Sequence, residues 1–241
     1  MKHAARRTAT ILVAAAAAAA VAAPSAGAME ATLKLSDTTQ AASAQAPAKG
    51  KLTVGKYVSY LKKQRMTKTL KAFQALPKNK QADFVKQLQD RRVLKAFAGV
   101  QASKTKSHVK QTVRYNKAVS FVKETTVKRG VKARGWNTKM TSNFTERIYN
   151  IPVTSTTTFI KYQAKKNPTV KDVGAKVTNV NAAFGIRVAD TEPDTRGQKV
   201  KLTAAVVATP KYRSAGKAAL VKDHSVTGTA KAAFTSRLAN R

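Results

Sequence analysis

The sequence predicts an α+β protein in which a short helical N-terminal segment is followed by an antiparallel β-rich domain, sandwich or barrel-like. Two periodicities carry this prediction. In 51–100, large apolar residues recur every three or four positions, as on one face of a helix. In 106–241 they alternate with polar residues, as in strands with one buried face. These strand-like runs follow one another without a helix-length crossover, which favours antiparallel pairing.

The start of the chain has the pattern of an export signal. A basic stretch that includes Arg6 and Arg7 precedes an uninterrupted apolar run of 13 residues, 11–23. This run is shorter than the ~20 residues that cross a bilayer, and small residues follow it up to Ala28. We therefore predict a signal peptide over 1–28 and a secreted bacterial protein, extracellular or associated with the cell wall. The arginine pair leaves general secretory and twin-arginine export both open.

Residues 29–50 are rich in alanine, serine, threonine and glutamine and hold few large apolar residues. Such a stretch buries too little apolar surface to offset the entropy lost on ordering. We expect a flexible linker or a pro-segment here. The mature chain after residue 28 has no transmembrane segment by length and hydrophobicity.

The apolar positions of 51–100 predict three or four short helices. Tyr57 and Leu61 lie one turn apart on the same face. Pro77 disfavours helix in the residue before it, so a helix should end there and a new one begin. The apolar pattern slips in phase near Asp90, where we expect another break. With 13 basic and two acidic residues, this segment offers either a solvated surface or a basic face for a polyanion.

Strands are predicted by the alternating runs of 106–241 and, in 156–162, by a high content of β-forming residues. The predicted strands are 109–115, 119–123, 156–162, 177–188, 200–207 and 218–234. Glycine, proline and asparagine between these runs mark turns, as in 193–197. The stretch 141–148 is open to a short helix instead. A sandwich or a barrel accommodates this series of strands.

Charge is the strongest global feature of the sequence. The chain carries 46 lysines and arginines against 11 aspartates and glutamates, a formal net charge of +35. Removing residues 1–28 takes away three cations and leaves +32, 43 against 11. A protein this basic is attracted to polyanions. The absence of cysteine excludes disulfides, a thiol nucleophile and a cysteine zinc site.

We find no motif of a catalytic or cofactor site, and we expect no catalytic residues, no metal and no cofactor. The mature chain has two histidines, His108 and His224. His224 lies between Asp223 and Ser225, but adjacent strand residues point to opposite faces and cannot form a triad. We therefore expect this tripeptide on a loop or a strand surface. The acidic cluster in 190–194 suggests a polar turn, with a calcium site as the alternative.

The strongest local signal for binding is the basic loop 128–136. Arginine can hold a phosphate, sulfate or carboxylate through paired hydrogen bonds, and tryptophan can stack on a base or a sugar. The alternative is a hairpin turn whose charges are solvated and whose tryptophan anchors the sheet core. The loop combines two glycines with five residues that we predict to bind a polyanion: Lys128, Arg129, Lys132, Arg134 and Trp136.

These features predict a secreted, strongly basic, non-enzymatic protein that binds anionic polymers at or outside the cell envelope by electrostatics. The partner would be a wall polymer, an acidic polysaccharide or extracellular nucleic acid. One alternative is a cationic antibacterial or toxin-like effector that acts on anionic envelopes. A secreted hydrolase or hydrolase inhibitor is a third class, which a cleft with two carboxylates would favour. The oligomeric state stays open.

Overall fold

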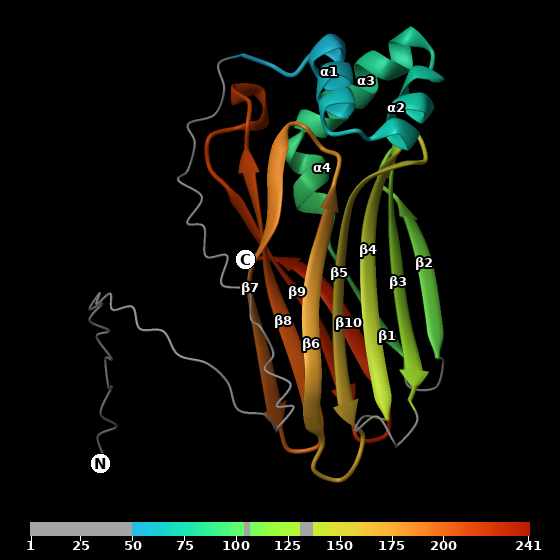
Figure 1. The fold of residues 1–241 in the computed structure, drawn as a ribbon, viewed down its shortest axis with the longest axis vertical. Helices are drawn as coiled ribbons and strands as arrows, with labels where there is room; N and C mark the ends of the chain where they lie inside the picture. Colours follow the sequence, from blue (N-terminus) through green and yellow to red (C-terminus); the bar gives the residue numbers. More distant parts are fainter. Residues whose placement is uncertain (1–49, 104–106, 131–136) are drawn as a thin grey trace, which may run out of the picture. The chain divides into compact units, whose positions relative to one another are not determined.

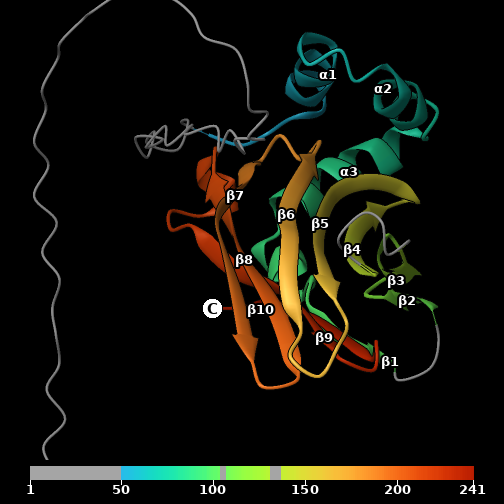
Figure 2. The same ribbon diagram turned by 60° about the horizontal axis from the view of Figure 1, so that its bottom comes forward.

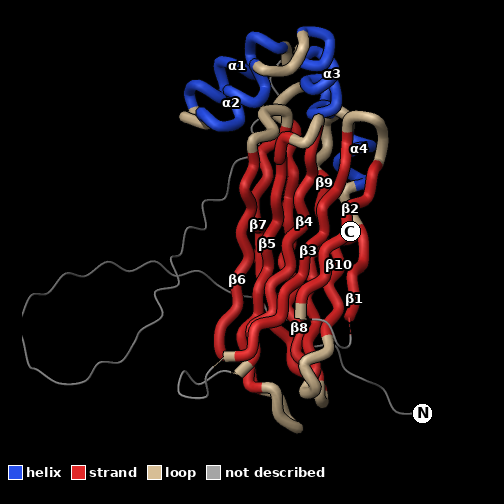
Figure 3. Tube along the Cα trace, turned by 90° about the vertical axis from the view of Figure 1, so that its right-hand side faces the viewer, coloured by secondary structure: helices blue, strands red, loops and turns tan. Residues whose placement is uncertain are grey.

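Two five-stranded antiparallel sheets face each other, and in the described part of the chain four short α-helices precede all of their strands (Figures 1 and 3). This computed structural model describes residues 50–103, 107–130 and 137–241. It confirms the predicted α+β class and the sandwich-like arrangement of the β-rich region. The predicted signal peptide, and all of the predicted linker except Gly50, lie outside the described residues.

Local sequence signals set the ends of the helices. The Thr53 hydroxyl accepts a hydrogen bond from the backbone N–H of Lys56 and so caps the first helix. Pro77 and Asp90 mark the two breaks that the sequence predicts. Within the described ranges, no helix combines the length and the hydrophobicity needed to cross a bilayer. The helices are α1 (Val54–Lys63), α2 (Thr67–Gln74), α3 (Lys78–Gln89) and α4 (Arg91–Ala96).

The strands form two antiparallel sheets, with the orders β1-β10-β9-β8-β7 and β2-β3-β4-β5-β6. The β6 and β7 strands lie side by side at one side of the sandwich, where the chain passes from one sheet to the other (Figure 2). The first sheet contains β1 (Gly99–Ser103), β7 (Phe184–Arg196), β8 (Lys199–Pro210), β9 (Leu220–Thr229) and β10 (Phe234–Asn240). The second contains β2 (His108–Arg114), β3 (Val119–Arg129), β4 (Thr138–Ile148), β5 (Ile151–Gln163) and β6 (Thr169–Asn179).

The expectations for four segments differ from the structure. The segments 177–188 and 218–234 each contain parts of two strands joined by a tight connection, rather than one long strand. The segment 141–148 belongs to β4, so a short helix there is wrong. The acidic cluster in 190–194 lies inside β7 and not at a turn, because the chain reverses only at Gly197, which has a positive φ of 54°.

The interior holds two apolar clusters with polar side chains between them. The larger cluster joins helix residues such as Phe73 and Phe84 to strand residues such as Phe144, so the helices pack on one end of the sandwich. The smaller cluster, which includes Met140 and Val226, fills the other end. The inward-facing side chains between the two clusters are polar, and we call them the polar layer. It contains five residues that are each 0 % exposed: Thr125, Ser142, Thr158, His224 and Ser236.

Candidate anion-binding groove

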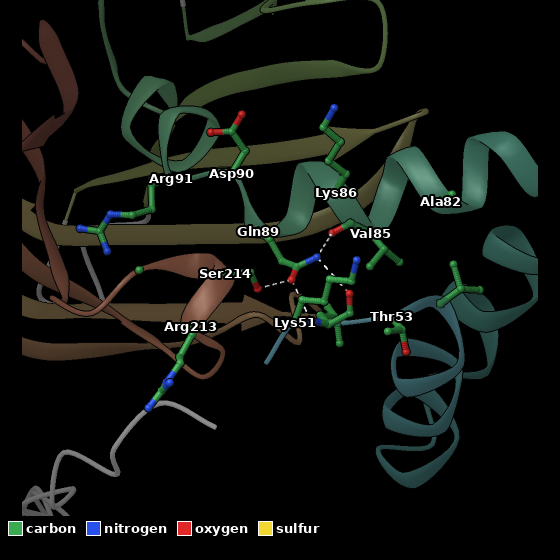
Figure 4. Close-up of a pocket in the computed structure, with 13 residues that line it drawn as sticks. Lys51, Thr53, Ala82, Val85, Lys86, Gln89, Asp90, Arg91, Arg213 and Ser214 are labelled. Atoms are coloured by element: carbon green, nitrogen blue, oxygen red, sulfur yellow. Dashed lines mark hydrogen bonds between the residues drawn. The ribbon is translucent and has the colours of Figure 1, made fainter. Parts of the chain in front are cut away.

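A groove of about 780 Å³ lies where the helices meet the loop that follows β8 (Figure 4). Its walls come from the residues before α1, from α3, and from the loop that contains the short 3₁₀ helix η2 (Arg213–Ala215). We call it the helical-end groove. One carboxylate and four cationic residues line it: Asp90, Lys51, Lys86, Arg91 and Arg213.

The Gln89 side chain holds the walls of the helical-end groove together. Its Oε1 accepts hydrogen bonds from the backbone N–H of Leu52, at 2.8 Å, and from the Ser214 hydroxyl. Its Nε2 donates to the carbonyl oxygens of Leu52, at 3.1 Å, and Val85, at 2.8 Å. One amide at the end of α3 therefore joins the start of the described chain to the η2 loop (Figure 4).

Arg91 fixes the same loop from the start of α4. Its Nη1 donates to the carbonyl oxygen of Ala218 and, at 3.4 Å, to that of Ala215. A Cβ atom on Gly216 would lie 2.7 Å from Arg91 Cδ, and Gly216 has a φ of +100°, which L side chains rarely adopt. Glycine at this position therefore lets the Arg91 side chain lie directly against the loop. Arg91 builds the wall as well as contributing charge.

Asp90 is compensated by a partner that does not line the groove. Its Oδ2 lies 2.9 Å from Arg92 Nη2, and its Oδ1 accepts from the Arg92 backbone N–H at 2.9 Å, which caps α4. The hydrogen bond from the Arg92 side chain lowers the pKa of Asp90 below its usual value. Because Asp90 is already paired, the four cationic lining residues leave the groove with a positive potential.

Only part of the predicted basic loop lies within the described residues. Lys128 and Arg129 are exposed at the end of β3 that lies away from the helices (Figure 1). Lys132, Arg134 and Trp136 lie outside the described residues. The strands β3 and β4 pair up to Arg129 and Thr138, so the loop joins two neighbouring strands. Lys128 and Arg129 lie at the end of the sandwich opposite to the helical-end groove.

Sequence reasoning missed the helical-end groove because its charges come from positions as distant as Lys51 and Arg213. No motif connects them, and only the fold brings the η2 loop to α3. The one available signal was the excess of 13 basic residues over two acidic residues in 51–100. That signal indicated the helical segment but could not select Lys86 among its lysines.

The tripeptide Asp223-His224-Ser225 does not build a catalytic triad. His224 is fully buried in the polar layer, and not on a surface as the sequence suggested. Its Nε2 lies 2.9 Å from Ser142 Oγ, which is also 0 % exposed, so no substrate reaches the pair. Asp223 points to the other face of β9, where its Oδ1 lies 2.9 Å from Arg241 Nη2.

Two further ionisable groups are buried beside the polar layer. Burial raises the pKa of Glu146 to about 7, although the charge of Lys222 opposes this shift. Burial lowers the pKa of Lys222 to about 8, and its Nζ donates to the Phe97 carbonyl oxygen at 2.6 Å. Lys222 therefore ties β9 to the end of α4. In residues 50–103, 107–130 and 137–241, no group of three or more histidines, aspartates or glutamates is arranged to hold a metal ion.

Comparison with known proteins adds no functional assignment. No protein-family model, no curated protein and no solved structure matched the chain. Function is therefore inferred from the geometry and charge of this molecule.

Proposed function

We propose that the protein is secreted and binds anionic polymers at or outside the cell envelope through electrostatic contacts, without catalysis. The observation that carries this proposal is the charge balance of the folded part. It holds 37 lysines and arginines, which is 46 less the nine in 1–49, 104–106 and 131–136. It holds nine acids, which is 11 less Glu30 and Asp37.

Most of these nine acids are not free to neutralise the surface. Four of them form ion pairs with lysine or arginine, Glu124 Oε1 lies 2.8 Å from His108 Nε2, and Glu146 is buried. Asp83 Oδ2 accepts a hydrogen bond from the Tyr149 hydroxyl at 2.8 Å. The exposed cations therefore greatly outnumber the carboxylates that could pair with them. A polyanion that contacts them releases its condensed counterions, which favours binding without a need for sequence recognition.

The helical-end groove gives such a polymer a defined place to bind. Lys86, Arg91 and Arg213 extend in different directions around it (Figure 4). Spread charges suit the successive anionic groups of a chain better than a single small anion. The basic loop with Lys128 and Arg129 supplies a second contact at the opposite end of the sandwich.

The test compares two triple variants with the same loss of charge, using duplex DNA as the polyanion. All six altered residues are exposed. The groove variant carries Lys51→Gln, Lys86→Gln and Arg213→Gln, and the control carries Lys199→Gln, Lys201→Gln and Lys231→Gln. If the groove makes the contact, its variant should lower the slope of log affinity against log salt by roughly 2–3, since each lost phosphate contact removes about 0.9. The control should change it by less than about one.

Three results bear on this proposal. Equal slopes for the groove variant and the control would contradict the groove as the contact surface. Salt-independent binding, or no binding of DNA, heparin or wall polymer, would contradict polyanion binding altogether. The loop is tested in parallel by replacing Lys128, Arg129, Lys132 and Arg134 with glutamine, which should also flatten the salt slope.

A further inference from the structure

A second basic hollow lies on another side of α3. It has a volume of about 360 Å³ and is lined by α3, by the connection between β2 and β3, and by the turn between β4 and β5. Lys80 lines it from α3, whereas Ala82, Val85 and Lys86 of the same helix line the helical-end groove. We call it the Tyr149 hollow, after the residue at its β4–β5 turn.

The β4–β5 wall of the Tyr149 hollow is held by a tight turn. Tyr149 and Asn150 have positive φ values of 48° and 65°, as in the two-residue hairpin turns that match strand twist. The Tyr149 backbone N–H donates to the Ala118 carbonyl oxygen at 2.7 Å, and its hydroxyl donates to Asp83 Oδ2 at 2.8 Å. These contacts fix the turn against both α3 and the β2–β3 connection.

The β2–β3 wall is fixed by Asn116. Its Oδ1 accepts hydrogen bonds from the backbone N–H groups of Ala118, at 2.8 Å, and Val119, at 2.7 Å. Its Nδ2 donates to Gln87 Oε1 of α3 at 3.4 Å. The hollow therefore exists before any ligand binds, which lowers the cost of ordering on binding.

The charge of the Tyr149 hollow has one sign. Lys80, Arg114 and Lys117 line it, and none of its lining residues is acidic. None of the three takes part in the ion pairs found within the described ranges. Lys80 Nζ lies 5.6 Å from the centre of the Tyr149 ring, which holds the lysine on this side of α3. The Asp83 carboxylate of α3 is engaged by the tyrosine hydroxyl.

The other lining groups are neutral and polar. Thr112 and Ser120 contribute hydroxyls, and Asn150 contributes an amide. Such groups form hydrogen bonds with the hydroxyls of a sugar or a polyol. The volume is at the small end of the range for ligand sites, about 300–1,000 Å³, and suits one repeating unit of a polymer.

We propose that the Tyr149 hollow binds a phosphate group carried on a polyol unit. This inference rests on the proposed function and names the chemistry of an end group of the polymer. Arg114 offers the planar pair of donors that fits a phosphate, and the two lysines compensate the remaining charge. At pH 7 a phosphate monoester carries about 1.5–2 negative charges, whereas a uronic acid carboxylate and a phosphodiester inside a polymer carry one each. The group that this hollow selects is therefore the terminal phosphate monoester of a polyol rather than a carboxylate sugar.

The test measures the binding of glycerol phosphate to the mature chain by calorimetry at low salt. We expect glycerol phosphate to bind at least tenfold more tightly than glucuronate or inorganic phosphate. The variant Arg114→Gln/Lys117→Gln should lower the affinity for glycerol phosphate at least tenfold and the affinity for duplex DNA by less than about threefold. The matched control, Lys199→Gln/Lys201→Gln, removes the same charge and should change glycerol phosphate binding by less than about threefold. Circular dichroism and the melting temperature establish that both variants fold.

The outcomes separate the two proposals. If glycerol phosphate does not bind while DNA does, the Tyr149 hollow is overturned and polyanion binding stands. If neither binds, both proposals fail. Equal binding of inorganic phosphate would overturn the role of the polyol, and equal binding of glucuronate would overturn the selection of phosphate. A loss in the control as large as that in the hollow variant would show that the binding is diffuse.

Discussion

At the residue scale, His224 makes folding sensitive to acid. Burial between the sheets lowers its pKa to about 3, from 6.5 when exposed. Its neighbours in the interior are the Ser142 hydroxyl and the Phe144 ring, whose centre lies 5.0 Å from that of the imidazole. Neither is an anion that could stabilise a charged imidazole. The folded state therefore requires neutral His224, and stability from this group is full above pH 6.5 and is lost as the pH falls toward 3.

The variant His224→Gln should reduce this loss of stability at low pH. Glutamine can still hydrogen-bond to Ser142 but takes up no proton. Between pH 6.5 and 3.5 we expect the variant to lose less stability than the wild type, by on the order of 4 kcal/mol. Urea denaturation at a series of pH values measures the difference. If the free energy of unfolding falls equally with pH in the two proteins, His224 does not cause the loss of stability in acid.

Glu146 has the opposite sign of pH dependence. Its pKa is raised from 4.5 to about 7 by burial, so the folded state favours the protonated carboxyl. Stability from this group is present below pH 4.5 and falls as the pH rises to 7. The variant Glu146→Gln should therefore gain stability relative to the wild type as the pH rises from 4.5 to 7, by roughly 2–3 kcal/mol. A constant difference across this range, in the same urea experiment, would contradict the raised pKa.

Gly228 is a residue whose missing side chain makes room for the smaller apolar cluster. A Cβ atom there would lie 2.7 Å from both Met140 Sδ and Tyr162 Oη. The Tyr162 hydroxyl donates to the Thr229 carbonyl oxygen at 2.9 Å, so it cannot move without losing that bond. Gly228→Ala should lower the free energy of unfolding by about 1–3 kcal/mol.

The control for this substitution is Gly55→Ala in α1, where a Cβ would meet nothing within 4 Å. It should leave stability unchanged or raise it by up to about 1 kcal/mol. Chemical denaturation of both variants measures the contrast. Equal stabilities would mean that the interior near Met140 adjusts freely.

At the element scale, Gln89 hydrogen-bonds α3 both to the residues before α1 and to the η2 loop. Replacing it with alanine removes the partners of the Leu52 backbone N–H and carbonyl oxygen. We expect Gln89→Ala to lower the free energy of unfolding by about 1–3 kcal/mol and to increase amide exchange at Leu52. Gln74→Ala is the control, because the Gln74 backbone carbonyl, and not its exposed side chain, accepts the bond from Gln81. Unchanged exchange at Leu52 would contradict the role of Gln89.

The elements that could be predicted from the sequence are those with a clear local signal. The helix breaks at Pro77 and Asp90 follow from local chemistry, and the run of β-branched and aromatic residues in 156–162 identifies the centre of β5. The β4 strand was harder to assign. Its Phe144 and Ile148 lie four residues apart, as in a helix, because the inward positions between and before them are the polar Glu146 and Ser142. Where the inward positions of a strand are polar, apolar and polar residues do not alternate, and the strand is not recognised from its sequence.

The candidate site was less predictable than the fold. Net charge indicated a polyanion partner, and that inference needs no structure. The places where charges gather depend on long-range packing, since Arg213 and Lys51 come near α3 through the Gln89 bonds, the Arg91 bonds and the larger apolar cluster. Arg114 and Lys80 likewise share a hollow only because the β4–β5 turn is fixed beside both. No local pattern could supply these contacts.

At the scale of the whole molecule, the charge that we propose to attract a polyanion also opposes folding. The described residues hold 37 cations and nine acids, so the folded surface repels itself. Salt screens this repulsion, because the Debye length falls from about 30 Å at 0.01 M to below about 10 Å above 0.1 M. Salt also weakens the attraction to a polymer, by competing with counterion release. Stability and polymer affinity should therefore respond to salt in opposite directions.

We expect the melting temperature to rise by several degrees when NaCl is raised from about 0.01 to about 0.3 M. A gain of about 1 kcal/mol corresponds to ~2–4 °C for a protein of this size. The control variant with glutamine at 199, 201 and 231 has less self-repulsion, so it should melt higher than the wild type at low salt and gain less from added salt. Over the same range, duplex DNA should bind the wild type progressively more weakly. At low salt, bound DNA should itself raise the melting temperature, since it binds the folded state and neutralises its surface. A melting temperature that is flat or falls with NaCl would show that the excess charge is already compensated within the fold, and the electrostatic account of binding would lose its premise.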